Sequence, residues 1–226
     1  MRIGKRLQKV IDLVDTDLNV VVDIGTDHGF VALKVIEDKN AKLVYATDIS
    51  EGSLKKAEEL AKKYNYSDRM ICVLSDGFNK LNINKANLVI IAGMGGYEIV
   101  KILSNPNNIN INEFILEPMQ HTKVLRKYLY ENGYNISYDK TIQDRDKFYS
   151  VIKCKKTDRP IKYKPADLLI GKTDLINNGE DFLNYLNYEL NSYESRLKYL
   201  DKEEKLEYGI LKKYKQKLGV KQWKRC

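Results

Sequence analysis

The chain has little cysteine and little histidine, with three residues of the first and two of the second among 226. The cysteines are widely spaced, and no pair stands at the spacing of zinc ligands, so the sequence predicts no zinc finger and no metal centre. An odd number of scattered cysteines also argues against a disulfide scaffold and favours a reducing compartment. With 43% hydrophobic residues, the chain can bury a core, and its composition is not that of a disordered protein.

Long apolar runs are also missing, because no stretch approaches the roughly 18 residues that identify a membrane helix. The basic first residues are followed by Asp12, Asp15 and Asp17, without an apolar core or a small-residue cleavage site. We therefore expect no secretory signal and no membrane association, and we predict a cytoplasmic protein. The sequence shows no internal repeat, and nothing in it indicates an obligate protein partner.

Positive charge is in excess, since 39 basic and 31 acidic residues give a net charge of +8. Residues 1–155 carry +3 of this charge, and the shorter remainder carries +5. A basic surface fits a polyanionic partner such as nucleic acid. The alternative is the lysine-rich composition of an AT-biased proteome, with which the many Asn, Ile and Tyr residues also agree.

Predicted strands and helices alternate along the first two thirds of the chain. Apolar runs of strand length occupy residues 20–25, 43–48, 70–74, 86–92 and 114–117, and helical segments occupy residues 2–14, 30–37, 50–64, 97–103 and 120–132. This alternation predicts an α/β fold with a mainly parallel, doubly wound sheet. Pro118 is expected to end the fifth strand.

Two further strands are predicted at residues 134–142 and 148–155. Because no helix separates them, they should form an antiparallel hairpin at a sheet edge. A mostly parallel, seven-stranded sheet that ends in such a pair is typical of the Rossmann-like class I methyltransferases. We expect this methyltransferase domain to cover residues 1–157.

The pattern changes at Pro160 and Pro165, which lie in a predicted linker, so residues 158–226 are expected to form a helical C-terminal domain. Its apolar residues recur three and four positions apart, at Phe182, Leu186, Leu190, Tyr193, Leu197, Leu200, Leu211, Tyr214 and Leu218. This spacing, interrupted by the charged residues 201–205, predicts an antiparallel helical hairpin with coiled-coil packing. We interpret the apolar stripe as the seam of that hairpin.

Polar or glycine-rich residues follow the predicted parallel strands, whose carboxyl ends meet at one edge of the sheet. The first group is Asp23-Ile-Gly25-Thr-Asp27-His28-Gly29, in which Asp27 replaces the second glycine of a dinucleotide fingerprint. An acid there disfavours a pyrophosphate but suits the amino group at the methionine end of S-adenosylmethionine. Gly25 lets the backbone approach closely, and Asp27 or His28 is expected to adopt an uncommon backbone geometry.

The later strand ends complete a predicted cavity for this cofactor. Asp48 is placed to accept hydrogen bonds from ribose hydroxyls, Asp76-Gly77 suits the adenine amine, and the glycine turn at 93–96 suits a flat ring. The candidate cofactor-binding residues are Asp23, Gly25, Asp27, His28, Gly29, Asp48, Ile49, Asp76, Gly77, Gly93, Met94 and Gly95. The alternative is a nucleotide-binding α/β domain of another kind.

Six motifs together resemble the bacterial TrmK family. They are Asp-Ile-Gly-Thr-Asp-His-Gly at 23–29, Thr-Asp-Ile at 47–49, Ser-Asp-Gly at 75–77, Ile-Ala-Gly-Met-Gly-Gly at 91–96, Leu-Glu-Pro-Met at 116–119 and Asp-Lys-Phe-Tyr at 146–149. The resemblance covers residues 1–155 by motif and the helical tail by layout. The chain departs from the family at Glu117, where the family's Leu-Gln-Pro segment has glutamine.

The resemblance implies a tRNA (adenine-N1)-methyltransferase that acts on adenine 22 of the D arm. Ring N1 has its own lone pair, so catalysis can depend on proximity to the sulfonium methyl group, and the target base must be unpaired. The product is cationic, and Asp27 is the first catalytic candidate for stabilising that charge, with His28 as its partner or as a base-edge contact. The alternative for His28 is to cap the following helix or to line the cofactor cavity.

Other assignments have alternatives too. Arg6 either anchors the cofactor carboxylate or has a plain surface role, Tyr149 either packs in an edge strand or stacks on a base, and His121 is expected at the surface. The candidate RNA-binding residues of the tail are Lys212, Lys213, Lys215, Lys217, Lys221, Lys224 and Arg225, which otherwise form a solvated helix face. The alternatives to a tRNA enzyme are a methyltransferase acting on another RNA or a small molecule, and an RNA-binding module without catalysis.

Overall fold

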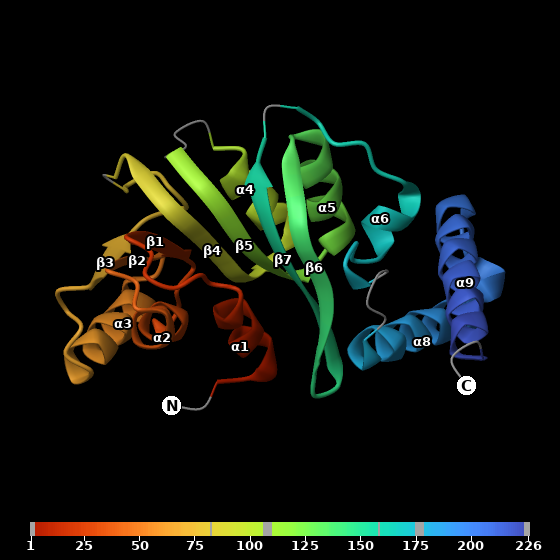
Figure 1. Cartoon of the computed structure of the whole chain (residues 1–226), viewed down its shortest axis with the longest axis horizontal. Coiled ribbons are helices and arrows are strands. Elements are labelled where there is room, and N and C mark those ends of the chain that lie inside the picture. The colour runs from red at the N-terminus through yellow and green to blue at the C-terminus, as the bar shows by residue number, and fades with distance from the viewer. Residues whose placement is uncertain (1–2, 82, 106–109, 158, 175–178, 224–226) are drawn as a thin grey trace.

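The computed structural model describes residues 3–81, 83–105, 110–157, 159–174 and 179–223. Its centre is a seven-stranded sheet covered by helices, and further helices lie beyond one sheet edge (Figure 1). The strands are β1 (Val20–Ile24), β2 (Leu43–Asp48), β3 (Met70–Leu74), β4 (Lys85–Gly95), β5 (Asn110–Gln120), β6 (Tyr134–Asp144) and β7 (Lys147–Lys156). The helices that cover the sheet are α1 (Lys5–Asp12), α2 (Phe30–Lys39), α3 (Glu51–Lys63), α4 (Gly96–Leu103) and α5 (Thr122–Glu131).

The strand order is β3-β2-β1-β4-β5-β7-β6. Neighbours among β1 to β5 are parallel, whereas β7 runs antiparallel to both β5 and β6. The predicted Rossmann-like fold, with an antiparallel hairpin at its edge, is therefore confirmed. The chain order reverses between β1 and β4, and ligands of doubly wound sheets bind outside the strand ends at such a switch point.

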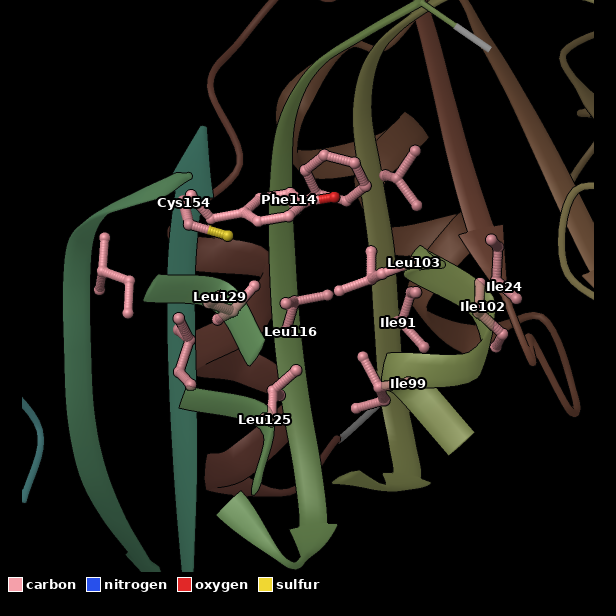
Figure 2. Packing of buried hydrophobic residues seen from close by; sticks show 14 of the residues in the cluster. Ile24, Ile91, Ile99, Ile102, Leu103, Phe114, Leu116, Leu125, Leu129 and Cys154 are labelled. Atoms are coloured by element: carbon pink, nitrogen blue, oxygen red, sulfur yellow. The ribbon is translucent and has the colours of Figure 1, made fainter. Parts of the chain in front are cut away.

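Alternate side chains of the central strands pack against opposite helical layers. Ile91 and Leu116 belong to a cluster that includes Leu125 and other residues of α4 and α5 (Figure 2). Their neighbours Ile90 and Ile115 belong to a second cluster, with residues of α1, α2 and α3. Because both faces of these strands are buried, the strands read as continuous apolar runs in the sequence.

The prediction that Pro118 ends the fifth strand is wrong, because β5 extends to Gln120. Pro118 pairs with Met94 of β4 between two register shifts of the β4–β5 ladder. Proline is tolerated at such an irregularity, because its missing N–H is not needed for a regular ladder hydrogen bond there. β4 also extends to Gly95, so most of the glycine turn belongs to the strand.

The C-terminal helices are α6 (Pro165–Leu169), α8 (Glu180–Ser195), the short 3-10 helix η1 (Leu197–Tyr199) and α9 (Lys202–Trp223). The predicted seam residues pack in one cluster, except that Leu197 is exposed. Residues 201–205 do not separate the two helices as predicted. Instead, Asp201 and Glu204 exchange side-chain to backbone hydrogen bonds in a capping box that starts α9, and the break lies at η1. The coiled-coil packing of the hairpin stays a prediction.

The tail is attached to the sheet domain through buried contacts. The Arg126 guanidinium of α5 donates to the Asp139 carboxylate of β6 at 2.8 and 2.9 Å, and to the Leu168 carbonyl of α6 at 3.2 Å. The Leu168 side chain belongs to the cluster between the sheet and the layer of α4 and α5. The domain boundary at residues 157 and 158 stays a prediction, but a truncation near residue 160 would remove side chains from the core of the sheet domain.

Candidate functional site

A cavity of about 440 Å³ opens at the carboxyl edge of the parallel strands, at the switch point between β1 and β4. Its lining residues are Ile24, Gly25, Asp27, Asp48, Ile49, Ser75, Asp76, Gly77, Ala92, Gly93, Met94, Glu98, Lys101 and Ile102. Eight of the twelve predicted cofactor-binding residues are therefore brought together. The volume is in the range of typical small-molecule sites.

The loop after β1 depends on left-handed backbone conformations. Gly25 has a φ of 73°, and a Cβ atom there would lie 2.2 Å from the Met94 Cε atom, so glycine is needed at this close approach. Asp27 has a φ of 51°, which confirms the uncommon geometry expected at Asp27 or His28. Aspartate tolerates this conformation better than most residues. As a result, Asp27 lines the cavity with a carboxylate that is 72% exposed.

Asp48 holds the loops after β1 and β2 together. Its Oδ2 atom accepts the Asp27 N–H at 3.1 Å, and its Oδ1 atom accepts the Ser50 N–H at 2.9 Å. Ser50 in turn caps α3 by accepting the Ser53 N–H at 3.3 Å. Each oxygen of a carboxylate can accept more than one hydrogen bond, so Asp48 can still accept from the hydroxyl groups of a ligand.

Four predicted residues are not on the cavity wall, namely Asp23, His28, Gly29 and Gly95. Asp23 is buried, its carboxylate accepts a 2.6 Å hydrogen bond from the Thr26 hydroxyl, and burial raises its pKa to about 6. A Cβ atom at Gly29 would lie 2.9 Å from the Cβ of Ala57, so Gly29 lets α2 and α3 approach each other. Asp23 and Gly29 therefore support the loop between β1 and α2 without lining the cavity. Their part in cofactor binding stays a prediction.

His28 lies beside the candidate catalytic carboxylate. Its Nε2 atom is 3.5 Å from Asp27 Oδ1 and 3.4 Å from Lys56 Nζ. The Asp27 carboxylate also accepts a 3.3 Å hydrogen bond from the Ser53 hydroxyl. The structure therefore brings together the two residues that the sequence paired, and it adds partners from α3.

Glu98 and Lys101 of α4 line the cavity but were not predicted from the sequence. The Glu98 carboxylate accepts the Gly95 N–H at 2.8 Å and so fixes the glycine turn at the start of α4. The Lys101 Nζ atom lies 3.9 Å from the Asp76 Oδ2 atom of the loop after β3. A glutamate three residues after the residue that precedes a helix is a sequence signal for the first contact, whereas the second depends on tertiary packing.

Glu117 and Arg6 form a contact next to the glycine turn. The Arg6 guanidinium donates to Glu117 Oε2 at 2.5 Å, and the Gly93 N–H donates to the same oxygen at 2.9 Å. Glu117 Oε1 is buried and has no hydrogen-bond partner among the described residues. Burial raises the pKa of Glu117 to about 7, although the interactions with Arg6 and Gly93 act in the opposite direction. Arg6 also lies over the Tyr149 ring, 5.1 Å from its centroid, so it is not a plain surface residue.

The predicted RNA-binding residues fall on and after α9. Four of them are exposed on this helix, namely Lys212, Lys213, Lys215 and Lys217. Lys221 belongs to the last turns of α9, and Lys224 and Arg225 lie outside the described residues.

The described residues include neither a membrane-spanning helix nor a metal-binding group of side chains. None of the helices in this part of the chain combines the length and the apolar character that crossing a bilayer requires. Across the same residues, no three His, Cys, Asp or Glu side chains are grouped so that they could hold a metal ion. Cys72 and Cys154 are free thiols, and Cys226 lies outside the described residues.

Comparisons with known proteins agree with this fold. Residues 3–152 match the family model of a methyltransferase domain. A putative tRNA methyltransferase of Mycoplasma pneumoniae is 31% identical over 179 residues, which are 77% of this chain and 82% of that protein. The tRNA (adenine(22)-N(1))-methyltransferase of Bacillus subtilis is 27% identical over 173 residues, 76% of this chain and 72% of that protein.

A solved structure extends the likeness to the helical tail. The structure of M. capricolum TrmK in complex with the cofactor product S-adenosyl-homocysteine aligns with a TM-score of 0.83 at 24% identity. The alignment covers 95% of this chain and 98% of that one. The arrangement of sheet domain and tail is therefore shared with that protein.

Proposed function

The chain belongs to the TrmK family of methyltransferase-domain proteins, and we propose that it transfers the methyl group of S-adenosylmethionine to N1 of adenine 22 in tRNA. The observation that carries this proposal is the cavity at the switch point, where acids and glycines from successive strand ends meet. The relatives named as tRNA methyltransferases support the substrate, and the net charge of +8 suits a polyanion. We expect the protein to act in the cytoplasm, where its substrate is found.

The residues of the cavity fit S-adenosylmethionine. Asp48 has acceptor positions left for the two ribose hydroxyls, and Asp76 can accept from the adenine amine. Asp27 suits the amino group at the methionine end, and Gly25 leaves room beside Met94. When bound, the cofactor supplies an electrophilic methyl group on a sulfonium.

Asp27 has the electrostatic role in this proposal. Adenine N1 attacks with its own lone pair, so no side chain has to remove a proton first. Positive charge develops on the purine, and the exposed Asp27 carboxylate on the cavity wall can stabilise it. His28, at 3.5 Å, and Ser53 hold that carboxylate in place. Arg6 and Glu117 act at a distance from the chemistry by fixing the turn that begins at Gly93.

The tail supplies the RNA-binding surface. Lys5 of α1 pairs with Asp181 of α8 at 2.8 Å, so α8 is tied to the helix that carries Arg6 and contacts the site. The exposed lysines of α9 then extend a basic surface away from the cavity. Structured RNA is recognised mostly by shape and through its backbone, which suits such a helical surface.

The test is methylation of unmodified tRNA by the full chain with S-adenosylmethionine. Nucleoside mass spectrometry should detect 1-methyladenosine, and primer extension should stop at position 22, because a methyl group on N1 blocks base pairing. A tRNA with guanine at that position is the matched control and should give no stop. Methyl transfer to ribosomal RNA or to a small molecule instead would support another methyltransferase. A tRNA mobility shift without methyl incorporation would support a binding module.

A further inference from the structure

Four exposed apolar side chains follow or end strands whose carboxyl ends form the edge where the cofactor cavity opens, and Ile49 is one of its lining residues. Phe30, Ile49, Tyr97 and Met119 are 38%, 75%, 59% and 43% exposed, and they lie at or just after the carboxyl ends of β1, β2, β4 and β5. Apolar side chains scattered singly over a surface are ordinary, but a group of them at one edge indicates a binding surface. This edge is where the proposed reaction takes place.

Two of these side chains form ring pairs with the two histidines of the chain. The His28 ring stacks on Phe30 with centroids 5.6 Å apart, and the Tyr97 ring lies against His121 with centroids 4.8 Å apart. The first pair follows β1, and the second joins the start of α4 to the start of α5. Tyr97 is more exposed than Phe30, and it directly follows the glycine turn at the end of β4.

The Tyr97–His121 pair is held by close backbone packing. A Cβ atom at Gly96 would lie 2.4 Å from the His121 carbonyl oxygen, so glycine is required for α4 to start this close to His121. His121 has a φ of 58° and is the N-cap residue of α5, so its position is set by the start of that helix. The ring pair is therefore a fixed surface.

The ring pair is close in the chain to residues that line two cavities. Glu98, the residue after Tyr97, lines the cofactor cavity. His121 lines a second cavity of about 310 Å³, which continues to Phe148 of β7 and Tyr185 of α8.

We propose that Tyr97, backed by His121, stacks on the unpaired purine that receives the methyl group. This inference rests on the proposed function and adds to it a residue that recognises the target base. An aromatic ring that is flat, exposed and fixed offers a purine a stacking face, and stacking of this kind is common where proteins bind unpaired bases. An RNA base is favoured over an apolar protein surface by the net charge of +8 and by the exposed lysines of α9.

The experiment compares Tyr97→Ala and Tyr97→Phe with a matched control, Tyr64→Ala. Tyr64 is a half-buried tyrosine at the C-terminal end of α3, at the opposite edge of the sheet. Tyr97→Ala should lower kcat/KM for tRNA roughly ten- to hundred-fold, the range for one lost base–aromatic stack. Tyr97→Phe keeps the ring and should stay near wild type, as should Tyr64→Ala. The Kd for S-adenosylmethionine, from calorimetry, should be unchanged in all three.

A spectroscopic readout reports on the stack directly. The tRNA for this experiment carries fluorescent 2-aminopurine at position 22. Saturating amounts of the wild-type protein or of the Tyr97→Phe variant should quench the 2-aminopurine fluorescence. The Tyr97→Ala variant should leave that fluorescence unquenched. His121→Asn, which removes a ring but tolerates the left-handed backbone, should give an intermediate loss of kcat/KM. Wild-type kcat/KM and equal quenching in Tyr97→Ala would overturn the inference and leave the proposed function standing. A wild-type protein that methylates no tRNA would overturn both.

Discussion

At the scale of single residues, Asp27 is the carboxylate on which the proposed chemistry depends. Asp27→Asn keeps a side chain that tolerates a φ of 51° and removes the charge. We expect kcat for tRNA methylation to fall about 10- to 1000-fold, as when one electrostatic contact to developing charge is lost. The Kd for tRNA, from filter binding, should stay close to the wild-type value, because Asp27 carries no phosphate contact. Equal losses of methylation and tRNA binding in a folded variant would contradict this role.

The raised pKa of Glu117 predicts that the difference in stability between the wild-type protein and a Glu117→Gln variant depends on pH. Its pKa is raised from 4.5 to about 7, chiefly by burial, so between these pH values the folded state binds more protons than the unfolded state. The wild-type free energy of unfolding therefore falls as pH rises from about 4.5 to 7. Glu117→Gln removes this titration, so its stability relative to wild type should rise over that window, by at most about 3 kcal/mol.

Urea unfolding of both proteins at pH 5, 6, 7 and 8 measures the effect. Asp23 and Asp174, whose pKa values burial raises to about 6, titrate in both proteins and cancel in the difference. If the free energies of unfolding of the two proteins changed with pH in parallel, Arg6 would compensate fully for the buried charge of Glu117. In that case the Arg6 contact outweighs the cost of burying Oε1 without a partner.

The sequence could predict which residues end the strands but not where each side chain points. Asp23, Asp27 and Asp48 all follow or end apolar runs, yet Asp23 is buried under the loop while the other two line the cavity. The difference arises from the left-handed turns at Gly25 and Asp27, which depend on contacts with Met94 and Asp48 from distant parts of the chain. The residue pattern around each strand end does not predict contacts with distant parts of the chain.

At the scale of elements, the loops after β1 and β2 act as one unit because Asp48 accepts a hydrogen bond from each. Asp48→Ala should raise the Kd for S-adenosylmethionine at least roughly tenfold, since it removes the ribose acceptor and releases the Asp27 N–H. Asp48→Asn keeps one acceptor oxygen and should give a smaller loss. Asp38→Ala, on the exposed side of α2, is the matched control. Calorimetry with an unchanged Kd in Asp48→Ala would remove this residue from the ribose site.

Element boundaries were predictable where the signal is local. β2 and β3 match their apolar runs, and Ser50 marks the start of α3 through its cap. The extension of β5 past Pro118 was not predictable, because it depends on the irregular pairing with β4. The start of α9 was missed although its signal is local, because Asp201 and Glu204 were interpreted as a charged break whereas their spacing forms a capping box.

At the scale of the whole molecule, charge is unevenly placed, with +5 of the net +8 after residue 155. If the tail binds tRNA, the triple variant Lys212→Ala/Lys213→Ala/Lys215→Ala should weaken tRNA binding. A control with the same net charge is Lys55→Ala/Lys62→Ala/Lys63→Ala, since these three lysines are exposed on α3.

The salt dependence separates local contacts from overall charge. Each phosphate contact that is lost should reduce the slope of log K against log salt by about 0.7 to 0.9. The tail variant should therefore show a flatter slope than the control, while both keep the wild-type Kd for S-adenosylmethionine, because neither set of lysines lines the cavity. Binding measured from 50 to 300 mM salt tests this. Equal slopes in the two variants would mean that tRNA responds to the overall field of the protein, and the exposed face of α9 would then be an ordinary solvated surface.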